Sequence, residues 1–146
     1  DGSKGELMAQ VLARLGSIKA VVVHGDDGLD EATVSGDSTI WIVNSGSVEE
    51  RKMSPTEFGI PVSKLDGLRV SNSDESAAMI NDVLRGGKGP ARDVVLINSA
   101  LALYVASDSD DIQKFLEISR ESLDSGGALS VLEKYRDFSN SCASND

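Results

Sequence analysis

Basic residues are scarce in this chain of 146 residues. Lys and Arg together number 14, against 24 Asp and Glu, which gives a formal net charge of −10. Nucleic acids and anionic membrane surfaces attract proteins through a basic face that neutralises phosphate groups. We therefore expect neither as a partner. A polyanionic substrate would need a cation in order to approach so acidic a protein.

Cysteine and long apolar runs are also lacking. Cys142 is the only cysteine, so the chain cannot form an internal disulfide, which suits a reducing compartment. The longest uncharged run, from Val94 to Ser107, is shorter than the roughly 20 residues of a membrane-spanning helix. The first five residues are polar or small, unlike a secretory signal peptide. We expect a cytoplasmic protein, or a plastid one if the source is a plant.

The pattern of apolar residues predicts an α/β domain whose C-terminal half is rich in helices. The uninterrupted apolar run 20–23 predicts a strand that has parallel neighbours and is buried on both faces. Residues 32–34, 39–43 and 47–53 predict short antiparallel strands, the last two joined at the turn signal Asn44-Ser45-Gly46. Helices are expected over 6–15, 73–85, 110–123 and 128–138, around a buried central helix over 94–105.

Helical spacing also predicts which side chains face the core. The inward residues are expected to be Leu7, Met8, Val11, Leu12 and Leu15 in the first helix; Ala77, Ile80, Val83 and Leu84 in the second, capped by Ser73; Ile112, Phe115, Leu116, Ser119 and Leu123 in the fourth; and Leu129, Leu132 and Tyr135 in the last. Trp41 is interpreted as a core residue. Ser54-Pro55-Thr56-Glu57 has the pattern of a capping box.

The segment Lys19–Glu31, KAVVVHGDDGLDE, carries the strongest candidate site. A buried strand runs into a glycine-containing loop that ends in two adjacent carboxylates, Asp30 and Glu31. Ligands of α/β enzymes bind outside the carboxyl ends of strands, and Mg²⁺ prefers carboxylate oxygens. From these residues alone, a metal site and a solvated acidic loop both remain open. We interpret Asp26 and Asp27 as turn-forming residues.

Three other features favour structural over chemical roles. His24, the only histidine, is expected to hydrogen-bond a neighbouring loop, although acid–base work is the alternative. Residues 86–90, GGKGP, resemble a phosphate loop but lack the GxxxxGK[ST] pattern, so we expect a helix end followed by a helix start, with Arg92 and Asp93 pairing locally or capping. The acidic run 107–111 lacks calcium-loop spacing and predicts a helix N-cap.

Three blocks in order, VVVHGDDGLDEAT, KGPARDVVLINSALALYVAS and ESLDSGGALSVLE, resemble the C-terminal part of the anthranilate phosphoribosyltransferase family. The resemblance extends from Glu6 to Phe138 and includes the hairpin between the first two blocks. It implies a nucleoside-phosphorylase/phosphoribosyltransferase-type α/β domain, of which residues 1–139 would be the later part and 140–146 a flexible tail. Transfer of a phosphoribosyl group from phosphoribosyl pyrophosphate (PRPP) to anthranilate, in tryptophan biosynthesis, is the implied activity.

The same resemblance assigns the metal site. In this family the Asp-Glu of the GLDE segment binds the Mg²⁺ that accompanies pyrophosphate, which implies Asp30 and Glu31 as ligands and Mg²⁺ as the cofactor. The family's GTGGD and KHGNR-type segments, its anthranilate contacts and its helical domain, through which a homodimer would form, are absent from this sequence. The chain alone is therefore expected to be inactive. A pyrimidine nucleoside phosphorylase and a non-catalytic homologue are the alternatives.

Overall fold

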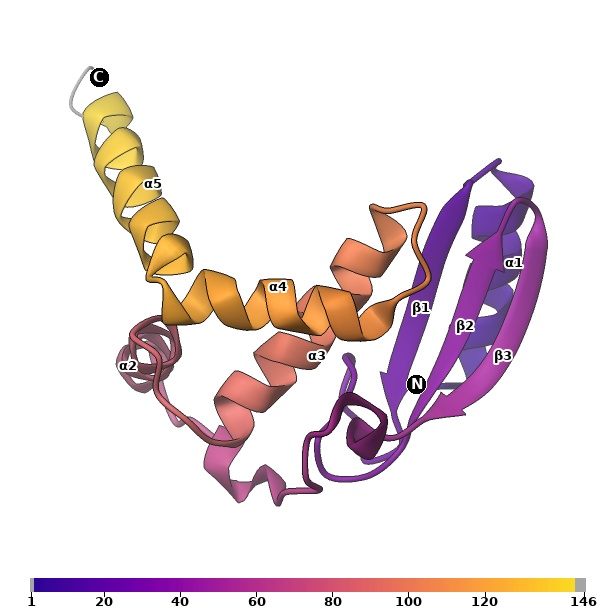
Figure 1. The fold of residues 1–146 in the computed structure, drawn as a ribbon, viewed down its shortest axis with the longest axis horizontal. Helices are drawn as coiled ribbons and strands as arrows, with labels where there is room; N and C mark the ends of the chain where they lie inside the picture. Colours follow the sequence, from indigo (N-terminus) through magenta and orange to yellow (C-terminus); the bar gives the residue numbers. More distant parts are fainter. Residues whose placement is uncertain (1, 144–146) are drawn as a thin grey trace.

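The computed structural model describes residues 2–143. Its elements are η1 (Gly2–Lys4), α1 (Gly5–Arg14), β1 (Lys19–Gly25), β2 (Ser38–Asn44), β3 (Ser47–Met53), η2 (Pro55–Phe58), η3 (Leu65–Leu68), α2 (Ser73–Leu84), α3 (Pro90–Val105), α4 (Ile112–Asp124) and α5 (Gly127–Ala143). The strands lie together in the first half, and the four longest helices follow them (Figure 1). The predicted α/β class and helix-rich second half are confirmed.

The sheet has the order β1-β2-β3, and both pairings are antiparallel. The prediction that β1 has parallel neighbours is therefore wrong. Strand β1 pairs with β2 in the antiparallel direction, and Val22 lies opposite Trp41. Among residues 2–143, no strand pairs with the other edge of β1. The apolar run in β1 has a different cause, because α1 contacts the sheet on one side and α3 packs against the other.

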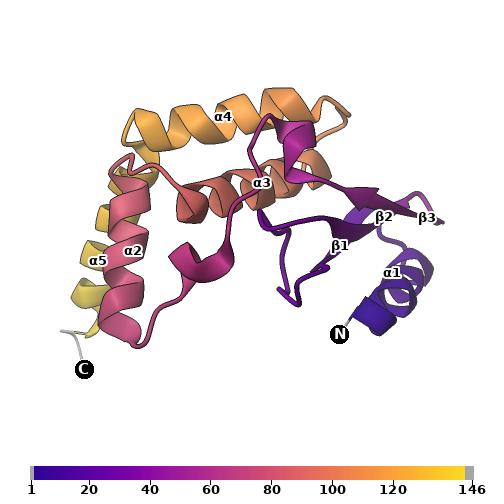
Figure 2. The ribbon, with the colours of Figure 1, turned by 90° about the horizontal axis from the view of Figure 1, so that it is seen from below.

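Strand β2 divides the core into two parts because its side chains alternate between the faces of the sheet. Ile40 and Ile42 belong to the larger cluster, with residues of α3 and α4. Trp41 and Val43 belong to the smaller cluster, under α1. Figure 2 shows α1 on one side of the sheet and the α3–α4 layer on the other. The interpretation of Trp41 as a core residue is confirmed by its 4% exposure.

The predicted hairpin and capping box are confirmed. The turn between β2 and β3 has positive φ at Ser45 (47°) and Gly46 (90°), as a two-residue hairpin turn requires. Ser54 and Glu57 form the reciprocal capping bonds of η2. The strand expected over residues 32–34 is wrong: the segment is buried, but it pairs with no strand of the sheet.

Helix α1 packs through its small residues, contrary to the predicted face. Gly5 and Ala9 are buried against the sheet, while Leu7, Met8, Val11 and Leu15 are between 47% and 78% exposed. A Cβ atom on Gly5 would lie 2.1 Å from Cζ3 of Trp41. Because the indole of Trp41 is large, only the smallest side chains of α1 fit against the sheet. Of the predicted face, only Leu12 packs against the smaller core cluster around Trp41.

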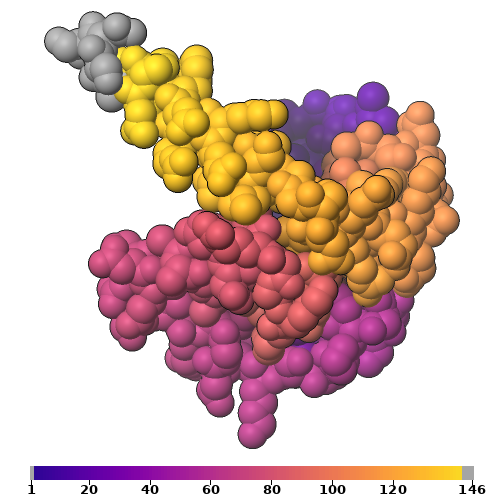
Figure 3. Space-filling model, turned by 60° about the vertical axis from the view of Figure 1, so that its left-hand side comes forward, coloured from indigo at the N-terminus to yellow at the C-terminus, as the bar shows by residue number. Residues whose placement is uncertain are grey.

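Helices α2 and α5 are also more exposed than predicted. Val83 is the buried residue of α2, Ile80 is 53% exposed, and the N-cap is Asn72 instead of Ser73. Helix α5 projects from the body of the molecule (Figure 3), and Tyr135 on its predicted inner face is 67% exposed. Residues 140–143 of the predicted tail are helical, and 144–146 lie outside the described residues.

The central and fourth helices match their predictions. Val94, Leu96, Ile97, Ala100 and Leu101 of α3 are buried. Phe115, Leu116, Ser119 and Leu123 of α4 are buried as well, and Asp111 caps the N-terminus of α4 by accepting from the Lys114 N–H. Within residues 2–143, none of the helices combines the length and apolar character that a bilayer span requires.

Candidate functional site

Strand β1 ends in a tight glycine-containing loop. The Gly25 N–H donates to the Leu29 carbonyl at 2.9 Å, and the Gly28 N–H donates to the Gly25 carbonyl at 2.9 Å. Gly28 has φ of 98°, which favours glycine. A Cβ atom on Gly25 would lie 3.2 Å from the Glu31 carbonyl oxygen. The two glycines therefore let the chain fold back and carry Asp30 and Glu31 just beyond the strand.

Asp27 organises this loop. Its carboxylate accepts from the Leu29 N–H at 3.1 Å and from the hydroxyl groups of Thr33 and Ser35. Burial raises the pKa of Asp27, but the hydrogen bonds from Ser35, Thr33 and Leu29 outweigh it, so the pKa lies below its usual 3.8. The interpretation of Asp27 as a turn-forming residue is confirmed.

Asp26 and His24 also have structural contacts. The Asp26 carboxylate accepts from Lys52 Nζ at 2.6 Å, and this bond is the main cause of its lowered pKa. The His24 ring lies against Gly2, where a Cβ atom would be 2.6 Å from the imidazole. The predicted hydrogen bond of His24 to a neighbouring loop is wrong: among residues 2–143 its side chain makes no hydrogen bond, and the ring packs against Gly2 instead.

The predicted ligands Asp30 and Glu31 differ in their surroundings. Asp30 is exposed, whereas Glu31 is half-buried beside a largely apolar cavity of about 470 Å³. The cavity is bounded by Leu29, by Leu68 and by residues of α2 and α3. Burial raises the pKa of Glu31, and the negative charge of Asp30 raises it further. A cation at this carboxylate would relieve both effects.

The carboxylate pair can serve a metal that needs few protein ligands. Among residues 2–143, no group of three or more His, Cys, Asp or Glu side chains gathers in metal-binding geometry. A closed structural site is therefore not formed by the described residues. Mg²⁺ needs less, since it commonly takes one or two carboxylates together with water and substrate phosphates. Metal binding by Asp30 and Glu31 stays a prediction.

Asn98 is a residue of this region that the sequence analysis missed. Its carboxamide accepts from the Ala32 N–H at 2.9 Å and donates to the Ala32 carbonyl at 3.0 Å. It also donates to the Val94 carbonyl of its own helix, at 3.0 Å. The available signal was a lone carboxamide side chain within the apolar stretch of α3. Asn98 thus connects α3 to the residue that follows Glu31.

The GGKGP segment forms the helix end and helix start that were predicted for it. Gly86, with φ of 88°, ends α2, and Pro90 is the first residue of α3 after the N-cap Gly89. The predicted local role of Arg92 is wrong. Its guanidinium is buried and donates from Nη2 to Asp124 Oδ1 at 2.8 Å, so it joins the start of α3 to the end of α4.

The sequence comparisons place the chain in a glycosyl transferase family. The model described as "Glycosyl transferase family, a/b domain" matches residues 2–129. An anthranilate phosphoribosyltransferase of Nitrosomonas europaea is 42% identical over 134 residues, which is 92% of this chain and 39% of that protein. The enzyme of the same name from Moorella thermoacetica is 44% identical over 128 residues, 88% of this chain and 38% of that protein. The chain spans about two-fifths of the length of these relatives.

The solved structures that are similar to this chain are also anthranilate phosphoribosyltransferases. Anthranilate phosphoribosyltransferase from Thermus thermophilus superposes with a TM-score of 0.82 at 31% identity, covering 94% of this chain and 40% of that one. A variant of the enzyme from Saccharomyces cerevisiae with Mg bound has a TM-score of 0.83 at 25% identity and the same coverage. The Saccharomyces cerevisiae enzyme in complex with PRPP and Mg has a TM-score of 0.70 at 26% identity, covering 82% of this chain and 34% of that one.

Proposed function

The chain belongs to the glycosyl transferase family, and we propose that it forms part of an anthranilate phosphoribosyltransferase. The complete protein would transfer the phosphoribosyl group of PRPP to the amine of anthranilate and release pyrophosphate. The observation that carries this proposal is the identity of 42% over 134 residues with a relative of that name. The site at the end of β1 is compatible with it, because the reaction handles a polyanion that an acidic protein can bind only with a cation.

The proposal includes Asp30 and Glu31 as Mg²⁺ ligands. Their donor set fits this ion, since carboxylate oxygens are hard ligands and the pair leaves room for water and phosphate. The raised pKa of Glu31 reports an unfavourable negative charge in a half-buried position. When bound, the ion would supply positive charge that stabilises pyrophosphate as its bond to the ribose carbon breaks.

The surrounding residues would hold the two carboxylates in place for this task. Asp27 is occupied by Leu29, Thr33 and Ser35 within the loop, so it is held as a structural group. Lys52 neutralises Asp26 at 2.6 Å. Asp30 and Glu31 have no such partners among the described residues, which leaves both carboxylates available to a cation.

The remaining parts of the proposal concern the whole protein. Its substrates would be PRPP and anthranilate, and it would act as a homodimer in the cytoplasm. The lone cysteine, Cys142, which is exposed on α5, is compatible with a reducing compartment. Size-exclusion chromatography with light scattering would test the dimer.

An assay of the complete protein tests the activity. Anthranilate fluorescence should fall with time when PRPP and Mg²⁺ are both present, and EDTA should stop the reaction. The 146-residue chain alone should give no turnover. Phosphorolysis of uridine or thymidine in place of phosphoribosyl transfer would contradict the proposal and identify a pyrimidine nucleoside phosphorylase.

The metal role has its own test. In the complete protein, Glu31→Gln should lower kcat/KM by about 100-fold, because a preorganised charge at the leaving group is lost. Asp37→Asn is the matched control, because it neutralises an exposed carboxylate of the same loop and should leave turnover near the wild-type rate. Normal Mg²⁺-dependent activity of Glu31→Gln would refute the assignment of this ligand.

A further inference from the structure

We propose that Asn98 is a positioning residue for the carboxylates at the end of β1. Its side chain would fix the backbone that follows Glu31 and so hold the metal ligands in their binding geometry. This inference rests on the proposed function, because it takes Asp30 and Glu31 as the metal ligands. It adds a residue of α3, far from them in the sequence, to the machinery of the site.

The carboxamide of Asn98 is complementary to both polar groups of Ala32. The Ala32 N–H lies 2.9 Å from Oδ1, and the Ala32 carbonyl lies 3.0 Å from Nδ2. The second Nδ2 proton goes to the Val94 carbonyl at 3.0 Å. Both donors of the amide are therefore used, and its oxygen accepts one bond. An aspartate would lose both donor bonds, and a serine or an alanine would be too short to make the pair.

This contact acts directly on Glu31. The Ala32 N–H belongs to the same planar peptide unit as the Glu31 carbonyl, so fixing that N–H fixes the plane of the unit. A Cβ atom built on Gly25 would lie 3.2 Å from the Glu31 carbonyl oxygen, so this peptide unit runs close to the end of β1. Asn98 thus fixes the backbone from which the Glu31 side chain departs.

The element that carries Asn98 is suited to this purpose. Its neighbours Leu96, Ile97 and Ala100 are each at most 2% exposed, so α3 is a rigid part of the core. The segment after Glu31 is buried but pairs with no strand of the sheet, and Ala32 is 0% exposed. Its polar groups need partners that a sheet would otherwise supply. Asn98, on the buried helix α3, provides a hydrogen-bond partner for both polar groups of Ala32.

A positioning role and a purely structural role predict different measurements. A structural contact affects the stability of the fold, whereas a positioning contact also affects the affinity of the site for its ion. The matched control is Ser119→Ala in α4. Ser119 is 6% exposed and donates from Oγ to the Phe115 carbonyl at 2.9 Å, a buried bond from side chain to backbone within α4.

The experiment measures Mn²⁺ binding to the complete protein by electron paramagnetic resonance, with inorganic pyrophosphate present and Mg²⁺ as competitor. Asn98→Ala should weaken binding about tenfold, in the range found for residues that orient metal ligands. Ser119→Ala should bind as the wild type does. Asn98→Ser should behave like Asn98→Ala, and its hydroxyl can bond the Val94 carbonyl and preserve α3. Without metal, amide hydrogen exchange at Ala32 should be faster in both Asn98 variants and unchanged in Ser119→Ala.

Each result decides the matter. Weaker metal binding in both Asn98 variants, with Ser119→Ala like the wild type, supports the inference. Metal affinity in Asn98→Ser equal to that of the wild type overturns it, whatever the thermal stability of the variant. A wild-type protein that binds Mn²⁺ but does not transfer phosphoribosyl groups refutes the proposed function, while the metal measurements still judge Asn98. A wild-type protein that binds no Mn²⁺ overturns both.

Discussion

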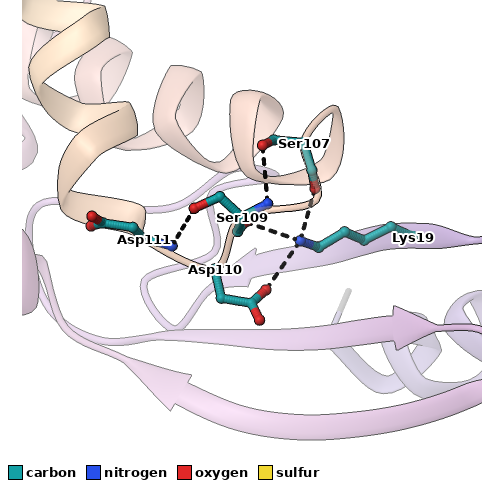
Figure 4. A network of polar contacts seen from close by, with 5 residues as sticks. All are labelled: Lys19, Ser107, Ser109, Asp110 and Asp111. Carbon is teal, nitrogen blue, oxygen red and sulfur yellow. Dashed lines mark hydrogen bonds and ion pairs between the residues drawn. The ribbon is translucent and has the colours of Figure 1, made fainter.

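The Lys19 ammonium lies 3.5 Å from the centroid of the Tyr104 ring. The same nitrogen donates to the carbonyl groups of Ser107 and Ser109, at 3.2 and 3.4 Å, and pairs with Asp110 at 3.2 Å (Figure 4). The Lys19 side chain is only 12% exposed. One side chain at the start of β1 therefore holds the connection between α3 and α4 against the sheet.

Lys19→Met should destabilise the protein by about 2 kcal/mol. Hydrogen bonds from a charged group and a desolvated cation–π contact each contribute on this scale, while Met preserves most of the apolar stem. Urea unfolding of the complete protein measures the change. Tyr104→Phe keeps the aromatic ring and serves as the control, with nearly wild-type stability. Equal losses in the two variants would contradict the role of the ammonium.

Gly5→Ala should lower stability by about 1 to 3 kcal/mol, as overpacking of a core does. Alanine normally stabilises a helix relative to glycine, so the expected sign is the reverse of the intrinsic helix propensity. The cause is Trp41, whose Cζ3 would lie 2.1 Å from the new Cβ atom. Thermal unfolding measures the effect. Gly36→Ala, where a Cβ atom meets nothing within 4 Å, is the control.

The pH dependence of stability should reflect Asp27. Its pKa is lowered from 3.8 in the folded protein, because the hydrogen bonds to its carboxylate outweigh the effect of burial. A depressed pKa gives stability that is fully present above the unfolded value and is lost as pH falls through the folded value. The stability difference between wild type and Asp27→Asn should therefore shrink as pH falls below about 4.

Denaturant unfolding at pH 6 and pH 3 checks this expectation. Ser35→Ala removes one donor to the Asp27 carboxylate and should weaken the pH dependence without abolishing it. A difference between wild type and Asp27→Asn that stays constant from pH 6 to pH 3 would show that Asp27 is not responsible.

Local signals in the sequence were sufficient for several turns and helix ends. The β2–β3 turn, the Ser54 capping box and the glycine at position 86 each depend on residues close in the chain, and each was predicted. The acidic pair after β1 was also visible, because a glycine-containing loop after an apolar strand is a local pattern. What the pair binds cannot be deduced from a local pattern, so its role depends on the resemblance.

Packing partners could not be predicted in the same way. An apolar run in β1 indicates that both faces are covered, but a parallel neighbour and a pair of helices produce the same pattern. Helix α1 has two faces that could be buried, and the size of Trp41, far along the chain, selects the one with small residues. Asn98 was missed because its partner Ala32 is 66 residues away.

The apolar faces that remain exposed follow the same reasoning. Leu15 is 78% exposed and Phe138 is 68% exposed, although both lie on faces with helical apolar spacing. Periodicity indicates that a face is suited to burial, but whether it is covered depends on the elements available to cover it. Among residues 2–143, the sheet and the other helices leave these faces open.

The pair formed by Arg92 and Asp124 should respond asymmetrically to mutation. Arg92 is 4% exposed, its Nη1 makes no hydrogen bond among residues 2–143, and its Nη2 donates to Asp124. Asp124→Ala leaves a buried positive charge without its partner, so it should destabilise the fold. The loss should be smaller than for a fully buried pair, because the Asp124 side chain is 50% exposed and water can solvate part of the charge left behind.

Arg92→Met should cost less than Asp124→Ala, because it removes the buried charge and keeps an unbranched side chain in its place. In the double variant, Asp124→Ala should add little further loss, since no buried charge remains to be neutralised. The Lys88 ammonium, 3.4 Å from Asp124 Oδ1, is largely exposed, so its pairing contributes little. Urea unfolding of the wild type, both single variants and the double variant gives the coupling energy between the two residues. If Arg92→Met were the more destabilising single variant, the expectation would be contradicted. Packing of the guanidinium between α3 and α4 would then contribute more to stability than neutralisation of its charge by Asp124.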